Sequence, residues 1–152
     1  MSDLPKISYS DGGVHVTVDL RALDQRMREA QQCLGDRVLE DCKACMPLLT
    51  GSLQQRSHTE DDGKKVVFPG PYARYQYGGK VMVDSVTGKG PRKIPTGPGE
   101  YILRFRKGAK LVATDRPLKY SNPQAVPQWF EHAKRQNKQF WIDGVKEKIG
   151  GK

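Results

Sequence analysis

The sequence has few apolar residues and no long run of them. Only 36% of its 152 residues are apolar, and the mean hydropathy is −0.69. No stretch reaches the roughly eighteen apolar residues that a membrane-spanning helix needs, so we expect no membrane contact. The opening residues, MSDLPKISYS, lack the apolar segment of a secretory signal. We expect one domain, residues 1–152, with a modest core.

Residues that commonly carry catalysis or bind metals are also scarce. The chain has three cysteines and three histidines. Cys42 and Cys45 have the spacing of half a zinc site, but the second pair of ligands is missing, and reduced thiols in a cytosol are the simpler interpretation. The stretch VTGKGPRK fails the phosphate-loop pattern at two positions, and the acidic run at 60–62 is most simply a solvated turn. We therefore predict no enzyme, no cofactor and no metal site.

Acidic residues are in deficit. The chain has 17 of them against 26 lysines and arginines, a net charge of +9. Most of the excess lies in residues 80–123, where ten cations face three acids for a net +7. We interpret this Gly- and Pro-rich segment as a long excursion with a hairpin, built from strand-like runs at 101–105 and 111–114. Such a long loop is normally functional or ordered by a partner, and its charge favours nucleic acid or another polyanion.

The first half of the chain predicts a hairpin followed by a long helix. Two alternating runs over residues 7–18 flank an Asp-Gly-Gly turn, which is typical of a β-hairpin. From Leu20 to Cys45, apolar residues recur at three- and four-residue steps, with Asp19 at the N-cap position. Gly35, inside this helix, indicates either close packing or a kink. An extended stretch from Leu53 and a polar turn at 60–65 then predict an antiparallel strand pair.

The segment GPYARYQYGG, residues 70–79, is aromatic, basic and bounded by glycines. Its period-two pattern places Ala73, Tyr75 and Tyr77 on one face, which predicts a strand with one apolar side. Core tyrosines under a sheet are the simplest interpretation. A base-stacking platform and a subunit contact are the alternatives.

A second helix is predicted at the C-terminus, opened by Pro127 as its first residue. Its apolar face includes Phe130 and Phe140 beside two tryptophans, Trp129 and Trp141. These aromatic residues are most simply core packing. The alternative is that the tryptophans anchor another subunit, because tryptophan at such sites can dominate binding energy.

The order of these segments resembles the minor capsid protein family of tailed bacteriophages with long non-contractile tails. A helix leads to a Pro-x-x-Thr-Gly-x-Leu turn, and a Tyr-Ala-x-Tyr-x-x-x-Gly segment follows. The chain matches these motifs at Pro47, Thr50, Gly51 and Leu53, and then at Tyr72, Ala73, Tyr75 and Gly79. The resemblance covers roughly residues 20–148, including the stretches FRKGAKLVATDRPLKYSNP and WFEHAKRQNKQFW.

The resemblance implies an α+β fold, in which a mainly antiparallel β-sheet packs against the long N-terminal helix, with a C-terminal helix and the 80–123 excursion added. It implies a structural subunit of the virion neck, in the tail-completion group that joins the tail to the DNA-filled head. Such a subunit is expected to form a ring around the DNA channel, six-fold by preference, and to be assembled in the host cytoplasm. Its expected partners are its own copies, other neck proteins, the tail terminator or tail tube, and channel DNA.

Two groups of residues are candidates for these contacts. For copies of the chain or neighbouring proteins they are Arg21, Arg28, Tyr72, Arg74, Trp129 and Trp141. For channel DNA or the neck they are Lys89, Arg92, Lys93, Arg104, Arg106 and Lys107. The alternative function is a sequence-nonspecific nucleic-acid-binding protein that uses the basic excursion and Tyr72.

Overall fold

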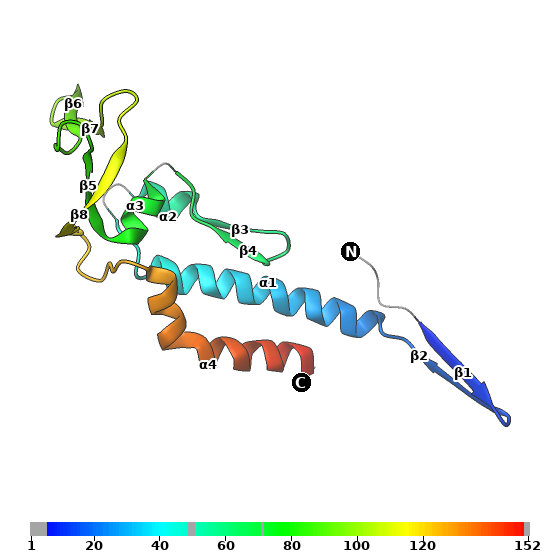
Figure 1. Ribbon diagram of the computed structural model, residues 1–152. Helices are drawn as coiled ribbons and strands as arrows, with labels where there is room; N and C mark the ends of the chain where they lie inside the picture. Colours follow the sequence, from blue (N-terminus) through cyan, green and yellow to red (C-terminus); the bar gives the residue numbers. More distant parts are fainter. Residues whose placement is uncertain (1–5, 49–50, 71, 151–152) are drawn as a thin grey trace.

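The computed structural model describes residues 6–48, 51–70 and 72–150 and confirms the α+β class. Two long helices, α1 (Arg21–Lys43) and α4 (Trp129–Gly150), lie side by side and run in opposite directions (Figure 1). The helix predicted from Leu20 to Cys45 is thus confirmed to within two residues at each end. Asp19 does not supply the side-chain cap, because Leu20 is the N-cap residue, but its Oδ1 accepts a hydrogen bond from the Arg21 backbone N–H at 3.0 Å.

The strands form four separate antiparallel ribbons rather than one sheet. Strands β1 (Ile7–Asp11) and β2 (Val14–Val18) form the predicted N-terminal hairpin, and β3 (His58–Glu60) pairs with β4 (Lys65–Val67) across the predicted polar turn. Of these two ribbons, β3–β4 packs on α1, whereas β1–β2 projects beyond the start of α1 (Figure 1).

The excursion contains strands, but they pair differently from the prediction. Strand β5 (Lys80–Asp84) pairs with β8 (Leu111–Pro117), and β6 (Arg92–Gly97) pairs with β7 (Glu100–Arg104). The runs on either side of Lys107-Gly108 therefore belong to different ribbons. The pair β5–β8 is a stalk, and β6–β7 lies at its far end (Figure 1). Local sequence does not fix the pairing of β5 with β8, because these two strands lie far apart in the chain, whereas β6 and β7 are adjacent in sequence.

Two segments predicted as extended are helical. Helix α2 (Ser52–Arg56) replaces the extended stretch predicted from Leu53, and α3 (Ala73–Gly78) replaces the strand predicted over the tyrosines. A segment of six residues is too short to distinguish the two-residue period of a strand from the 3.6-residue period of a helix. In the helix, Ala73 and Tyr77 are four residues apart and share the inner face. Gly79 ends α3 in the left-handed conformation, with φ 70°.

The core is small and is centred on Trp129, the first residue of α4. Trp129 is 1% exposed, and it packs with the fully buried Met46 and Cys42. The rings of Phe68 and Tyr77 meet the indole edge-on, with centroids 5.6 and 4.8 Å away. Helix α4 begins two residues after the predicted Pro127, because Gln128 adopts a positive φ of 50° immediately before it.

Candidate functional site

The β6–β7 ribbon carries exposed cations. Its register places Arg92 directly opposite Arg104, so both side chains leave the same face of the ribbon. Both are exposed, and neither has an acidic partner among the described residues. On the other face, the Lys93 ammonium lies 4.7 Å from the centre of the Tyr101 ring. Two like charges directly opposite destabilise a ribbon, and an anion between them would relieve the repulsion.

Arg106, predicted to contact channel DNA or the neck, is paired within the chain. Its guanidinium holds the carboxylate of Asp84, with 3.0 Å between Nε and Oδ2, and Asp84 is 2% exposed. The Arg106 guanidinium holds the pKa of Asp84 below its ordinary value, helped by a hydrogen bond from the backbone N–H of Val86. This ion pair joins the end of β5 to the segment after β7. Arg106 therefore stabilises the stalk, whereas Lys89 and Lys107 lie on exposed turns beside it.

The residues expected to contact neighbouring proteins are mostly bound within the chain. Arg21 pairs with Asp19, and Arg28 pairs with Asp24 one helical turn earlier. The Tyr72 hydroxyl, on a side chain that is 48% exposed, donates to the carbonyl of Leu103 in β7 at 3.3 Å, which links α3 to the distal ribbon. Arg74 lies over the ring of Tyr75, 4.7 Å from its centre.

The two tryptophans proposed as subunit anchors are buried within the protomer. Trp129 is the centre of the core, and Trp141 is 8% exposed between α4 and α1. The indole N–H of Trp141 donates to the carboxylate of Asp41 at 2.6 Å. The other interpretation, core packing, therefore describes both residues, because their rings are covered by the chain itself. The neighbouring Phe140 is 56% exposed, and the Arg37 guanidinium of α1 lies 4.4 Å from the centre of its ring.

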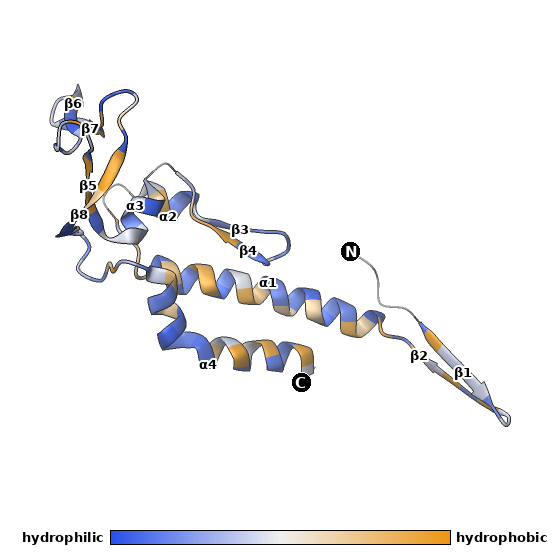
Figure 2. Ribbon diagram, in the orientation of Figure 1, coloured by the Kyte–Doolittle hydropathy of each residue, from blue (hydrophilic) through white to orange (hydrophobic). Residues whose placement is uncertain are grey.

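The N-terminal ribbon is a surface that the candidate residues did not include. All ten residues of β1 and β2 are exposed, among them Ile7, Tyr9, Val14, Val16 and Val18, each at 44–64%. The register pairs Ile7 with Val18 and Tyr9 with Val16, so these four side chains share one face. Figure 2 shows apolar residues on both strands of this projecting ribbon. The alternation of Val14, Val16 and Val18 was visible in the sequence, but nothing in it indicated that this face stays uncovered.

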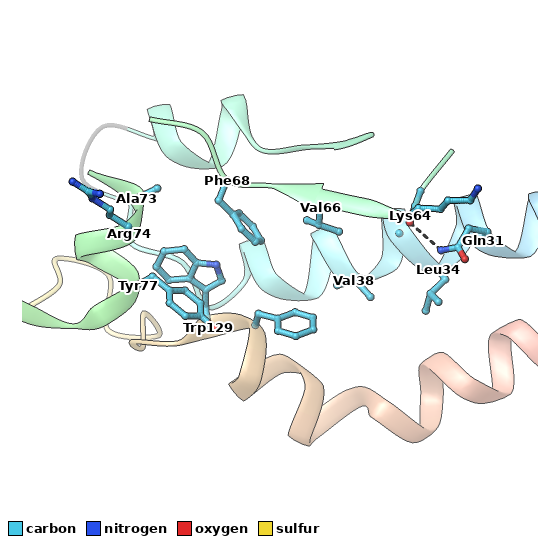
Figure 3. Close-up of a pocket in the computed structure, with 13 residues that line it drawn as sticks. Gln31, Leu34, Val38, Lys64, Val66, Phe68, Ala73, Arg74, Tyr77 and Trp129 are labelled. Atoms are coloured by element: carbon cyan, nitrogen blue, oxygen red, sulfur yellow. Dashed lines mark hydrogen bonds between the residues drawn. The ribbon is translucent and has the colours of Figure 1, made fainter. Parts of the chain in front are cut away.

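A second uncovered surface is an open apolar groove with a volume of about 680 Å³. Helix α1, the β3–β4 ribbon, α3 and the start of α4 form its walls, and its apolar lining includes Leu34, Val38, Val66, Phe68 and Phe130. Figure 3 shows Lys64 and Arg74 at opposite ends of the groove. These two cations are the charged residues among its described lining.

The cysteines and acids offer no metal centre within the described residues. No cluster of three or more His, Cys, Asp or Glu side chains is placed to hold an ion there. Burial raises the pKa of Cys42 to about 12, which keeps it a thiol rather than the thiolate that metals bind. In the acidic run, Glu60 bonds His58 and Asp61 pairs with Lys65. None of the described helices combines the length and apolar character needed to cross a bilayer.

Comparison with known protein families gives a match. A family model described as "Minor capsid protein" matches residues 14–100, which run from β2 to the first residue of β7. No curated protein and no solved structure matches this chain. The match covers more than half of the chain and includes both sequence motifs that carried the resemblance. The chain therefore belongs to the minor capsid protein family of bacteriophages.

Proposed function

We propose that this minor capsid protein is a subunit of the virion neck, where it forms a ring around the DNA channel and joins the tail to the head. Its family makes it a structural protein of the phage particle, and the position in the neck is the further step. The observation that carries this step is the form of the protomer. A small core holds two long helices, and ribbons project from both ends of the body (Figure 1).

Projecting ribbons suit a subunit that is completed by its neighbours. A two-stranded ribbon alone in water is marginally stable and gains stability when another surface covers it. Cyclic assemblies with head-to-tail contacts use two different surfaces of one chain, and this protomer offers different surfaces at its two ends. Six-fold symmetry is our preferred arrangement. The basic excursion would then contact adjacent neck proteins, the tail terminator or tube, or the DNA.

Cryo-electron microscopy of the purified virion neck tests this proposal. We expect the chain to be traceable as a ring between the head and the tail tube. The same density would show whether Lys89, Arg92 and Lys93 face the lumen or a neighbouring protein. If the chain is absent from the particle, the structural role is wrong, and if it is found elsewhere in the capsid, the neck position is wrong.

A second function, nonspecific binding of DNA, is favoured by the opposed pair Arg92 and Arg104. Guanidinium groups bind phosphate oxygens through paired hydrogen bonds, and two of them on one ribbon face could hold the DNA backbone. Binding should weaken steeply with salt, because each phosphate contact releases a condensed counterion. A structural neck subunit could also use this contact.

A matched pair of variants tests the DNA contact. The double change Arg92→Gln/Arg104→Gln should weaken duplex binding and lower the salt slope by about 2, roughly one unit for each lost phosphate contact. The double change Arg135→Gln/Lys138→Gln, on the exposed surface of α4, removes two positive charges elsewhere and is the control. Equal losses in both variants would mean that net charge alone drives binding. Salt-insensitive binding by the unmodified protein would rule the contact out.

A further inference from the structure

The β1–β2 ribbon has the form of a surface that docks on another protein. One face carries two directly opposed apolar pairs, Ile7 with Val18 and Tyr9 with Val16. The other face is polar, with Ser8 opposite Thr17 and Ser10 opposite His15. The ribbon is therefore amphipathic, although its apolar face is exposed to water. A β-ribbon normally buries such a face.

The junction with α1 directs the ribbon away from its own body. Asp19 accepts hydrogen bonds from both the backbone N–H and the guanidinium of Arg21, with 2.9 Å from Nε to Oδ1. These contacts link the connection after β2 to the first residue of the helix. The ribbon extends from this junction for about 17 Å, at roughly 3.4 Å per residue, beyond the start of α1 (Figure 1). A surface that covers its apolar face must therefore come from outside the protomer.

The same chain carries a groove that suits this ribbon. The groove between α1 and the β3–β4 ribbon is open and apolar, with Leu34, Val66 and Phe68 among its walls. A smaller hollow of about 390 Å³ lies between α1 and α4, but its lining includes Glu147 as well as cations. The larger groove has room for several side chains of valine or tyrosine size.

The charges of the ribbon and of the groove also match. Asp11 lies at the tip of the ribbon, and its carboxylate accepts a hydrogen bond from the Tyr9 hydroxyl at 3.3 Å. The charged residues among the described lining of the groove are the cations Lys64 and Arg74, one at each end (Figure 3). A ribbon lying along the groove would bring its acidic tip to one of these cations. The smaller hollow, where Glu147 lies, offers no such match.

We propose that the β1–β2 ribbon of one subunit docks its apolar face into the groove of a second copy of this chain. The proposal deepens the ring assigned under the proposed function, because it names the contact between neighbouring subunits. The contact is head-to-tail, since ribbon and groove are different surfaces, and repeated contacts of this kind close into a ring or extend as a filament. Each subunit both donates a ribbon and accepts one.

Cysteine crosslinking between two variants of the full chain tests the contact. One variant carries Val16→Cys on the apolar face of the ribbon, and the other carries Val66→Cys in the groove. Both also carry Cys33→Ser, because Cys33 is an exposed free thiol. After mixing at high concentration and oxidation, we expect a covalent dimer of one copy of each variant. Thr17→Cys replaces Val16→Cys in the control, because it lies on the same strand and points to the opposite face.

The outcomes separate the possible occupants. A dimer severalfold more abundant with Val16→Cys than with Thr17→Cys supports the proposal. Equal dimer yields with Val16→Cys and Thr17→Cys, or no dimer at all, would overturn it, and the ribbon would then dock on a different protein. A crosslink at monomer mass, in a chain that carries both Val16→Cys and Val66→Cys, would mean that the ribbon folds back into its own groove and would also overturn it.

A second measurement does not depend on thiol geometry. Val16→Asp places a charge on the docking face and should shift purified assemblies to monomers in sedimentation velocity, whereas Thr17→Asp should not. The two proposals can fail separately. If the variants crosslink but the chain is absent from the neck, the contact between subunits stands and the neck position is wrong. If the chain forms a neck ring in which the ribbon lies away from the groove, the neck position stands and the contact is wrong.

Discussion

Gly35 in α1 and Gly63 in the β3–β4 turn pack backbone against backbone. A Cβ atom added at Gly35 would lie 2.5 Å from the carbonyl oxygen of Gly63, and one added at Gly63 would lie 2.5 Å from the carbonyl oxygen of Gln31. The Gln31 amide also donates to the Gly63 carbonyl at 3.1 Å. Close packing, one of the two explanations that the sequence allowed for Gly35, is thus the correct one. This contact sets the distance of the β3–β4 ribbon from α1 and forms one end of the groove.

Gly35→Ala should destabilise the protein although alanine is the better helix former. The helix preference favours alanine by about 1 kcal/mol. The new methyl group meets backbone atoms, which cannot rotate aside, and overpacking of this kind typically costs about 1–3 kcal/mol. We expect a net loss in the free energy of unfolding, measured by urea denaturation.

Gly144→Ala is the matched control for that experiment. Gly144 is an exposed glycine in the interior of α4, and a Cβ atom added there meets nothing within 4 Å. Only the helix preference applies, so this variant should gain up to about 1 kcal/mol. If both variants gain stability, the close approach of Gly35 to Gly63 is absent in solution.

The two tryptophans should respond differently to replacement by phenylalanine. Trp141→Phe removes the hydrogen bond to Asp41, and bonds to charged groups contribute about 1.5–3 kcal/mol. The Trp129 indole N–H is buried and has no partner among the described residues, so Trp129→Phe loses packing and removes an unsatisfied donor. We expect Trp141→Phe to cost more, by about 1–3 kcal/mol.

The comparison can be made by fluorescence, because the chain has two tryptophans and each variant keeps one as the probe. Denaturation of each variant should also be monitored by circular dichroism, which checks that fluorescence and secondary structure report the same unfolding transition. Equal losses would mean that the bond between Trp141 and Asp41 contributes little, or that a partner satisfies Trp129 in solution.

The thiols should differ in reactivity according to their burial. Cys33 is exposed, whereas Cys42 is fully buried with a pKa raised by desolvation to about 12. Because the thiolate is the reactive form, Ellman's reagent at pH 8 should label Cys33 rapidly and Cys42 only after unfolding. Cys33→Ser should abolish the fast phase. Rapid labelling that survives this change would show that the core around Cys42 opens readily.

The same burial predicts a loss of stability in alkali. The folded state binds the Cys42 proton more tightly than the unfolded chain, in which the thiol has its ordinary pKa of 9.0. The unfolded state therefore gains stability from ionisation as the pH rises above about 9, and folding stability falls between pH 9 and 12. Cys42→Ala should reduce this slope, although the half-buried tyrosines Tyr77 and Tyr120, whose pKa values are also raised by desolvation, will retain part of it.

The sequence predicted elements whose signals are local and repeated. The long α1 repeats its apolar spacing over six turns, and the Asp11-Gly12-Gly13 turn fixes the first hairpin. The tyrosine segment was predicted wrongly because Ala73, Tyr75 and Tyr77 satisfy an alternating pattern over six residues, although they lie in α3. Only its contacts with Trp129, 52 residues beyond Tyr77, select the helix. For the same reason the pairing of β5 with β8, which are separated by the whole β6–β7 ribbon, could not be foreseen.

Candidate contact residues were harder still to predict, because charge in a sequence does not tell whether a cation is already paired. Arg104 and Arg106 are two residues apart and looked equivalent. The structure leaves Arg104 opposite another arginine and places Arg106 on the buried Asp84. Likewise, the alternating pattern around Tyr9 and Val16 is the same as that of a half-buried hairpin. The sequence does not show that the rest of the fold leaves this face uncovered.

Asp84→Asn should loosen the stalk of the excursion without affecting the helices. The substitution removes the negative charge that holds Arg106, so the backbone amides of β5 and β8 should exchange with deuterium severalfold faster, while those of α1 remain unchanged. Asp115→Asn is the control, because Asp115 lies exposed on β8.

The same ion pair predicts a dependence on pH. Since the pKa of Asp84 is lowered in the folded state, the ion pair stabilises the stalk at pH values above the ordinary pKa of 3.8, and this stabilisation is lost as the pH falls below that value. Acidification should therefore reproduce the faster exchange in the unmodified chain, after correction for the intrinsic pH dependence of exchange. If Asp84→Asn and Asp115→Asn behave alike, the stalk is held by its strand pairing, and Arg106 is available for a partner.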